Sequence, residues 1–292
     1  VFDEYRYFEP NRIFEIIEFK SHKIALTICE DLWDEQDETF TPLNHSKMYT
    51  ISPMQELMKL NPDCMINIAA SPFSYVQHQT RMKVLQRNAL KYQMPLLYVN
   101  HCGAQTELIF DGGSCALNKD GKTIAMAPFF IENFHVIDLF GASITSTIEQ
   151  VTPSKNELIF KALTCGIRDY FSKQNFKQAI LGLSGGIDSA LTLVLAVAAL
   201  GKENVLAVLL PSGFSSNHSI EDALALVKNL DCKHQLLPIE DNFQSLLKTL
   251  KPSFEGTEFG LAEENIQARL RGVLLMAISN KFGYILLNTS NK

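Results

Sequence analysis

The sequence SGGIDSA at residues 184–190 joins an apolar segment, AILGL, to a segment typical of a helix, SALTLVLAVAAL. This strand–loop–helix order suits phosphate binding, because Gly185 and Gly186 let backbone N–H groups approach phosphate oxygens without a Cβ in the way. The start of the helix adds a partial positive charge. Two serines of the loop can donate hydroxyl hydrogen bonds, and Asp188 beside a polyphosphate predicts a Mg²⁺ ion between them.

The same loop could instead be a tight strand-to-helix turn, with Asp188 as a first-turn acid that the helix dipole stabilises. The full string in its strand–loop–helix context favours the nucleotide site over that turn. No GxxxxGK[ST] motif is present, which argues against transfer of a γ-phosphate. Binding through the pyrophosphate leaves the α-phosphate open to attack, so the loop predicts a site that transfers AMP to a substrate.

Strands and helices alternate on both sides of this loop. Strands are expected at residues 178–183, 205–210, 234–238 and 284–287, and helices at residues 157–173, 189–200, 220–230, 242–250 and 262–280. Ser219 and Asp222 are expected to form a capping box at the start of the third of these helices. Such alternation predicts a doubly wound parallel sheet, in which ligands bind beyond the carboxyl ends of the strands.

The preceding sequence is richer in strands, which we expect at residues 23–28, 64–68, 95–100, 114–117 and 123–126. One helix is expected at residues 78–92, with a buried face formed by Met82, Leu85, Ala89 and Leu90. This pattern fits a layered α/β sandwich. The sequence VTPSKNE then breaks the pattern, since Pro153 cannot sit inside a strand ladder and Ser154 can cap a helix. We therefore expect two domains, residues 1–152 and 153–292.

The composition narrows the possible partners. The formal net charge of −6 and the isoelectric point of about 5.7 argue against nucleic acid or an anionic membrane as the main partner. No apolar run approaches the roughly 20 residues that span a bilayer, and we expect no signal peptide. The six cysteines are scattered without a CxxC pair, which indicates reduced thiols in a cytoplasmic protein.

The loop resembles the PP-loop of the N-type ATP pyrophosphatases, a superfamily that includes the synthase halves of GMP, asparagine and NAD synthetases. Its members activate an oxygen as an AMP ester, which a nitrogen nucleophile then displaces. The resemblance implies ATP and Mg²⁺ as cofactors, with Asp188 as the metal ligand. The residues expected to bind ATP are Gly182, Leu183, Ser184, Gly185, Gly186, Ile187, Asp188, Ser189 and Thr289.

The later segment ENIQARLRG…MAISNK…LLNTSNK resembles NAD synthetases in particular. The resemblance implies that Asn265 contacts deaminated NAD, that Arg269 lies beside that ligand and that Thr289 contacts ATP. Spacing alone favours a solvated helix face for the stripe formed by Asn265, Arg269, Gly272 and Met276. The segment PSGFSSNHSIEDA also resembles this family, and the family's acidic residue after the NKSE signature would lie past Lys292.

A cysteine ends the first predicted strand, in the sequence KIALTICEDLW. A thiol at a strand end is well placed as a nucleophile, although a lone cysteine is more often a small buried hydrophobic residue. This segment and FDEYRYFEP resemble the nitrilase-type amidohydrolases. The resemblance implies that Cys29 is the nucleophile, that Glu4 is a second glutamate of the site and that Ser71 binds glutamine. Gln77 stands where the family has Lys or Arg.

The two resemblances together imply a glutaminase joined to an NAD synthase that amidates deaminated NAD, in a homo-oligomeric protein without nucleic-acid or membrane partners. We expect the chain to be a fragment, because the family's first Glu and its Lys would lie before Val1. We therefore expect it to hydrolyse glutamine poorly. The alternatives are another amidating PP-loop ligase, or a non-catalytic nucleotide-binding fragment.

Overall fold

The computed structural model describes residues 7–33, 51–140 and 153–289, and the chain divides into two compact units. The first unit comprises residues 1–162 and the second residues 163–292. The helix α3 (Lys155–Lys173) contains this division, and the hydroxyl of Ser154 caps it by accepting a hydrogen bond from the N–H of Glu157 at 3.3 Å. The predicted cap is therefore confirmed. Glu4 lies outside the described residues.

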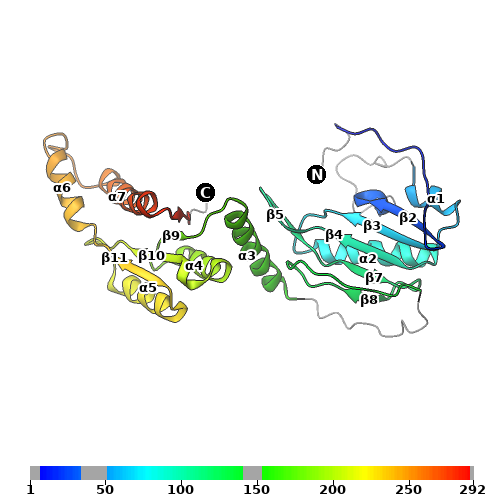
Figure 1. Ribbon diagram of the computed structural model, residues 1–292. Coiled ribbons are helices and arrows are strands. Elements are labelled where there is room, and N and C mark those ends of the chain that lie inside the picture. The colour runs from blue at the N-terminus through cyan, green and yellow to red at the C-terminus, as the bar shows by residue number, and fades with distance from the viewer. Residues whose placement is uncertain (1–6, 34–50, 141–152, 290–292) are drawn as a thin grey trace. The chain divides into compact units, whose positions relative to one another are not determined.

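The first unit is built on a six-stranded mixed sheet with the order β1-β2-β3-β4-β7-β8 (Figure 1). Its strands are β1 (Ile17–Phe19), β2 (His22–Ile28), β3 (Cys64–Ala69), β4 (Leu96–Asn100), β7 (Cys115–Leu117) and β8 (Thr123–Met126). The three central strands β2, β3 and β4 are parallel, and the outer strands pair antiparallel. A separate hairpin consists of β5 (Cys102–Gln105) and β6 (Leu108–Asp111).

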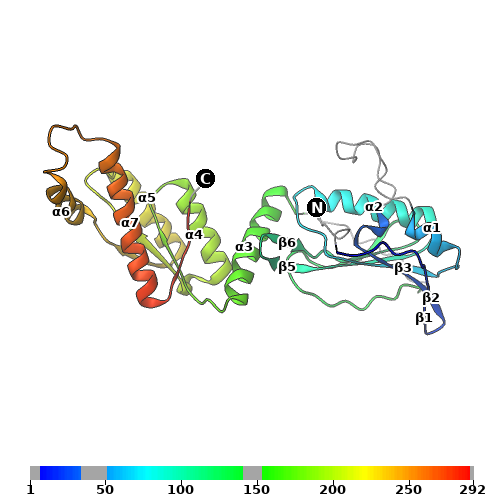
Figure 2. The same cartoon turned by 90° about the horizontal axis from the view of Figure 1, so that it is seen from above.

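Helices cover one face of this sheet (Figure 2). These are α1 (Pro53–Met58) and α2 (Gln77–Tyr92), and a short 3₁₀ helix, η2 (Cys29–Leu32), follows β2. Because side chains alternate along a strand, the residues between the buried ones point to the other face. On that face Ile28, Ile68 and Val99 are 61%, 49% and 48% exposed. The sheet thus has one covered face and one exposed apolar face.

The buried face of α2 differs from the predicted one. Met82, Leu85 and Ala89 are buried as expected, but Leu90 is 49% exposed, so that part of the prediction was wrong. The face that meets the sheet instead includes polar side chains that are buried, namely His78, Arg81 and Asn88. The helix therefore contributes charge and hydrogen-bonding groups to the interior as well as apolar packing.

The second unit contains a four-stranded parallel sheet with the order β11-β10-β9-β12. The strands are β9 (Ala179–Gly182), β10 (Val205–Leu209), β11 (Lys233–Leu236) and β12 (Ile285–Leu286). The helices are α4 (Ile187–Leu200), α5 (Asn217–Leu230), α6 (Glu240–Leu250) and α7 (Leu261–Phe282), with a 3₁₀ turn, η4 (Lys202–Asn204). No helix within the described ranges is long and apolar enough to cross a membrane.

The two faces of this sheet carry separate cores. Leu181, Leu183 and Leu209 pack with residues of α4 and α5 on one face, whereas Ile180 and Val208 pack with Leu275 of α7 on the other. The predicted doubly wound arrangement is therefore confirmed, and with it the α/β class.

The predicted capping box at the start of α5 was wrong. The helix begins at Asn217, and the hydroxyl of Ser216 accepts the capping hydrogen bond from the N–H of Ser219 at 3.1 Å. Ser219 thus lies inside the first turn, because the run SSNHS offers several possible caps and sequence spacing alone does not separate them.

Candidate functional site

The loop between β9 and α4 lies at the carboxyl end of a central strand of the second unit. The first backbone hydrogen bond of α4 runs from the N–H of Ala190 to the carbonyl of Gly186 at 3.1 Å. The N–H groups of the first turn of α4 precede that bond and point out of the helix start. They therefore form the kind of N-terminus that binds anions.

The conformation of the loop depends on Gly185. Its φ of +84° lies in the left-handed region, which glycine adopts without strain. A Cβ at this position would stand within 3.0 Å of the carbonyl oxygen of Ser219, at the start of α5. Any larger residue would therefore push the loop away from α5, so Gly185 brings the two helix starts close together.

The serines of the loop hold it in shape. Ser189 is buried, and its hydroxyl accepts a hydrogen bond from the N–H of Ser184 at 3.3 Å and donates one to the carbonyl of Gly186 at 2.9 Å. The two serine hydroxyls lie 3.1 Å apart. In contrast, Asp188 is exposed in the first turn of α4, where a carboxylate faces solvent beside the helix start.

A cavity of about 240 Å³ adjoins this loop at the carboxyl ends of β9 and β10. Its wall includes Ser184, Ser215, Ser219 and the guanidinium-bearing Arg271 of α7. Arg271 donates from Nε to the carbonyl of Leu210 at 2.9 Å and from an Nη to the hydroxyl of Ser212 at 3.3 Å. Burial lowers the pKa of Arg271 below its ordinary value. Sequence reasoning missed Arg271, although it lies two residues beyond Arg269.

The segment after β10 is fixed from the opposite side by α6. The carboxylate of Glu240 accepts a hydrogen bond from the N–H of Gly213 at 2.7 Å, and Gln244 donates to the same carboxylate at 2.7 Å. The hydrogen bonds from Gln244 and Gly213 hold the pKa of Glu240 below its ordinary value. A Cβ on Gly213 would stand 3.1 Å from Glu240 Oε2, so the small residue fits this contact.

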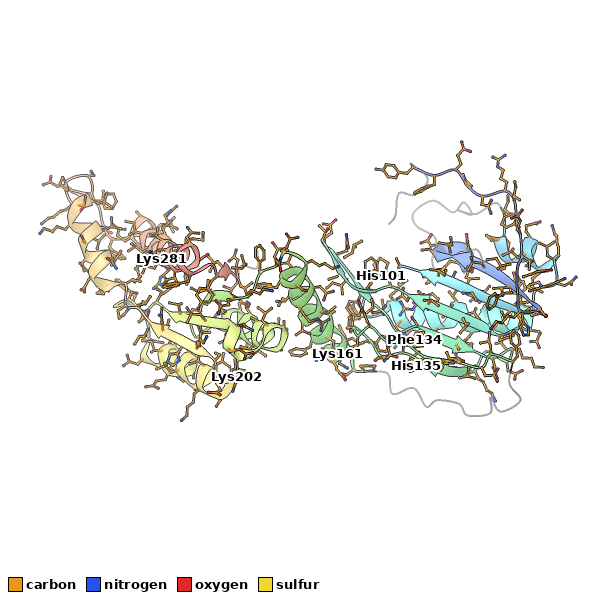
Figure 3. The ribbon with its side chains drawn as sticks, in the orientation of Figure 1. His101, Phe134, His135, Lys161, Lys202 and Lys281 are labelled. Carbon is orange, nitrogen blue, oxygen red and sulfur yellow. The ribbon has the colours of Figure 1, made fainter. Side chains whose placement is uncertain are left out.

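In the first unit, the parallel strands β2, β3 and β4 end at one edge of the sheet. Ile28 pairs with Ile68, and Ala69 pairs with Asn100. The residues that follow these strands therefore gather at this edge, Cys29 after β2 and Ser71 after β3. Figure 3 labels His101, which follows Asn100 and begins the turn into the hairpin β5–β6.

The backbone of Cys29 adopts a left-handed conformation with a φ of +48°. Such a conformation is uncommon for a residue other than glycine and must be held by its surroundings. The side-chain amide of Asn67 donates to the carbonyl oxygen of Cys29 at 3.3 Å and to the hydroxyl of Thr27 at 3.0 Å. Cys29 is half-buried, on a sharp turn between a strand and a short helix.

The family model described as NAD synthase matches residues 159–292. Over its full length the chain is 45% identical to a glutamine-dependent NAD(+) synthetase of Synechocystis sp. and 37% identical to one of Thermotoga maritima, covering 52% and 54% of those proteins. The structure of glutamine-dependent NAD+ synthetase from Acinetobacter baumannii, in complex with adenosine diphosphate, superposes with a TM-score of 0.85 and 36% identity over the whole chain. The chain is thus similar over its full length to glutamine-dependent NAD(+) synthetases.

The chain spans about half the length of the curated NAD(+) synthetases it matches. It covers 53% of the Acinetobacter baumannii chain. Similarity to NAD(+) synthetases thus extends through both compact units, whereas the match to the NAD synthase model is confined to residues 159–292.

Most of the residues predicted for an NAD(+) synthetase site lie near the carboxyl ends of strands in the two sheets. The loop residues 182–189 meet at the end of β9, and Gly182, Leu183 and Ser184 line the cavity. Asn265 is half-buried on α7 and Arg269 is exposed there, while Thr289 follows β12. Arg269 is not among the residues that line the cavity, and Arg271 takes that place.

The two residues predicted to bind glutamine, Ser71 and Gln77, lie near each other along the chain. Ser71 is half-buried, and its N–H donates to the side-chain oxygen of Asn100 at 3.0 Å. Gln77 is half-buried at the start of α2. Among the described residues, no group of three or more His, Cys, Asp or Glu side chains is arranged to hold a metal ion. All six cysteines are free thiols.

Proposed function

We propose that this chain carries the NAD synthase chemistry of its family, the ATP-dependent conversion of deamido-NAD(+) to NAD(+) through an adenylated intermediate. The observation that carries the proposal is the loop SGGIDSA, held between β9 and α4 in a segment that matches the NAD synthase model. The same loop would suit another amidating PP-loop ligase, and the full-length similarity to NAD(+) synthetases favours deamido-NAD(+) as the acceptor.

The loop residues 182–189 are proposed to hold ATP, with Thr289 as a further contact. The N–H groups at the start of α4 would bind the β- and γ-phosphates, which leaves the α-phosphorus accessible. A carboxylate oxygen of the nicotinate group then forms a bond to that phosphorus, and the bond to pyrophosphate breaks. Asn265 and Arg269 are proposed to contact deamido-NAD(+), because both lie on α7 near its start.

Asp188 is proposed to hold Mg²⁺ together with the phosphate oxygens of ATP. A single exposed carboxylate beside a helix start fits this ion, which takes one or two protein carboxylates and completes its shell with phosphate and water oxygens. When bound, the ion neutralises charge on the polyphosphate. Asp188 would set where that charge is neutralised, and the N–H groups of α4 would orient the phosphates.

The first unit is proposed to supply ammonia from glutamine. The thiol of Cys29 would attack the side-chain amide carbon, forming a thioester as the carbon–nitrogen bond breaks and the thiol proton leaves with ammonia. Water then hydrolyses the thioester, which releases glutamate and regenerates the thiol. Ser71 and Gln77 are proposed to bind glutamine, and Glu4 is proposed as a further group of the site. In the second unit ammonia attacks the adenylated carbonyl, AMP leaves, and the amide forms.

We also propose the domain boundary, the oligomeric state and the location of the protein. We place the boundary between the glutaminase part, residues 1–152, and the synthase part, residues 153–292, because the helix that leads into the second unit is capped at Ser154. A homo-oligomer in the cytoplasm suits an enzyme with free thiols and small-molecule substrates.

The test is NAD formation by the chain from deamido-NAD(+), Mg-ATP and ammonium chloride. Asp188→Ala is expected to reduce the rate by at least about a hundredfold while leaving the melting temperature unchanged. Asp241→Ala is the matched control, since Asp241 is also an exposed acid in the first turn of a helix, α6. Equal rates for these two variants, or no NAD formation by the parent chain despite binding of Mg-ATP, would contradict the proposal.

A further inference from the structure

A buried ion pair lies beneath the glutamine-binding edge of the first unit. Arg81 of α2 and Asp111 of β6 are both 1% exposed. The guanidinium donates two parallel hydrogen bonds to the carboxylate, at 3.0 Å and 2.7 Å. Burial would lower the pKa of Arg81, but the hydrogen bonds to Asp111 raise it above its ordinary value, so the guanidinium stays charged. The pair joins a helix to a hairpin thirty residues further along the chain.

Asn100, at the end of β4, connects this pair to Ser71. Its side-chain amide donates to Asp111 Oδ1 at 2.9 Å and to the carbonyl of Gly112 at 2.8 Å. The carbonyl oxygen of the same side chain accepts the hydrogen bond from the N–H of Ser71 at 3.0 Å. With both donors committed to the hairpin, the Asn100 amide has one orientation, and its oxygen points at Ser71.

Tyr98, two residues earlier on β4, provides a second connection. Arg81 lies over its ring, with the guanidinium carbon 5.4 Å from the ring centre. Its phenol is hydrogen-bonded to the hydroxyl of Ser71. Burial raises the pKa of Tyr98 to about 12, which keeps the phenol protonated near neutral pH. Ser71 is therefore held at its backbone by Asn100 and at its hydroxyl by Tyr98.

Burying two charges costs free energy that their attraction only partly offsets, so stability alone gives little reason for such a pair. A fixed charge network does have a use where one side chain must be held to within a few tenths of an ångström. Both contacts of Ser71 rest on Arg81 and Asp111. We propose that the Arg81–Asp111 pair, acting through Asn100 and Tyr98, is a positioning device that orients Ser71 for the side chain of glutamine.

His78 is a further ionisable residue near the pair, and it interacts electrostatically with Arg81 and Asp111. His78 lies one turn earlier on α2, is buried, and packs edge-on against Phe129. Burial and the positive charge of Arg81 lower the pKa of His78, so it is neutral at pH 7. Among the residues that the structure describes, the Nδ1 atom of His78 finds no hydrogen-bond partner. Asp111 accepts hydrogen bonds from Arg81 and Asn100.

The inference rests on the proposed glutaminase function, and equilibrium binding of L-glutamine by calorimetry tests it. A Cys29→Ala background prevents turnover. Tyr98→Phe removes only the hydroxyl that meets Ser71 and is expected to weaken glutamine binding about tenfold, the effect of one lost hydrogen bond. Asp111→Asn is expected to weaken it at least as much. Lys83→Ala, at an exposed position of the same helix, is the control and leaves binding unchanged.

A double-mutant cycle separates positioning from general stability. If the pair acts through Ser71, Tyr98→Phe costs no further affinity once Ser71→Ala is present. Melting temperatures, measured on the same samples, report stability, so a loss of affinity can be distinguished from a loss of folding. The residual glutamate release of the Cys29 protein provides a second readout, in which Tyr98→Phe raises KM for glutamine and leaves kcat unchanged.

Three outcomes would overturn the inference. Glutamine affinity equal to the parent in Tyr98→Phe and Asp111→Asn would show that the pair does not position Ser71. Additive losses of affinity in the Ser71→Ala background would indicate a structural role. Absence of glutamine binding by the parent would remove the glutamine site itself, whereas the ammonia-dependent reaction of the second unit would then still test the synthase proposal separately.

Discussion

Gly185, in the loop between β9 and α4, lies against the backbone of Ser219, so close that no other side chain fits between them. Because the left-handed φ of +84° also favours glycine, two independent constraints select this residue. Gly185→Ala is expected to displace the loop and to abolish measurable Mg-ATP binding, while unfolding remains cooperative. Calorimetric titration with Mg-ATP provides the measurement.

Gly186 offers the matched control for that substitution. It has a φ of −82°, and a Cβ there would stand 3.4 Å from the hydroxyl oxygen of Ser184, an ordinary contact. Gly186→Ala is expected to reduce Mg-ATP affinity by less than about tenfold. Similar losses in both variants would mean that the contact with Ser219 does not determine the shape of the loop.

The buried pair formed by Arg81 and Asp111 predicts an asymmetric effect on stability. Asp111→Leu alone leaves a buried guanidinium without its partner and is expected to cost about 3–5 kcal/mol. The double variant Arg81→Met with Asp111→Leu removes both charges and is expected to cost clearly less than Asp111→Leu alone. Urea denaturation measures the free energies, and a double variant less stable than the single one would contradict the argument.

Two buried acids of the first unit predict loss of stability at high pH. Burial raises the pKa of Cys115 and of Tyr98 to about 12 each, above the ordinary values of 9.0 and 10.0. Between the ordinary and the raised values, the unfolded chain loses these protons and the folded chain keeps them. The free energy of unfolding is therefore expected to fall as pH rises above about 9.

Urea denaturation at a series of pH values between 7 and about 11 would measure this slope. Cys115→Ala removes one of the two groups and is expected to flatten it. An exposed residue such as Lys83 serves as the control position. A slope that is unchanged in Cys115→Ala would show that this thiol does not titrate differently in the folded and unfolded states.

Asn67 donates a hydrogen bond to the carbonyl oxygen of Cys29, and replacing Asn67 is expected to loosen the turn at Cys29. Asn67→Ala leaves that carbonyl and the hydroxyl of Thr27 with one hydrogen bond fewer, at a cost of about 1–3 kcal/mol. Cys29 should then be alkylated faster by iodoacetamide. Peptide mass spectrometry measures the rate, with the half-buried Cys102 as an internal reference. Equal acceleration at both cysteines would indicate general loosening instead.

The loop from β9 to α4 was predictable because its signals are local. Small residues, an apolar strand and a helix start fall within about fifteen positions of one another along the chain, and the structure confirms the strand, the loop and the helix. The parallel arrangement of the strands in the second sheet was predictable for a similar reason, because strands and helices alternate along the sequence. Such features depend on neighbours in sequence, which a single sequence contains.

The polar interior of the first unit was not predictable in this way. Arg81 lies on α2 among lysines and glutamines, and only its partner Asp111 explains why it is buried. Leu90 was expected in the core because the helical period allowed it, yet the face that packs on the sheet includes Arg81 and Asn88 instead. Arg271 was missed for a related reason, since its place depends on a hydrogen bond to the carbonyl of Leu210, which directly follows β10.

The exposed face of the six-stranded sheet is expected to determine how this chain behaves in concentrated solution. Ile28, Ile68 and Val99 present a flat aliphatic surface that water wets poorly. Surfaces of this kind attract amphiphilic dyes, detergents and one another. Concentrated samples are therefore expected to cluster through this sheet and to scatter light at concentrations where folding is intact. For this chain, colloidal stability would set the practical limit on concentration before unfolding does.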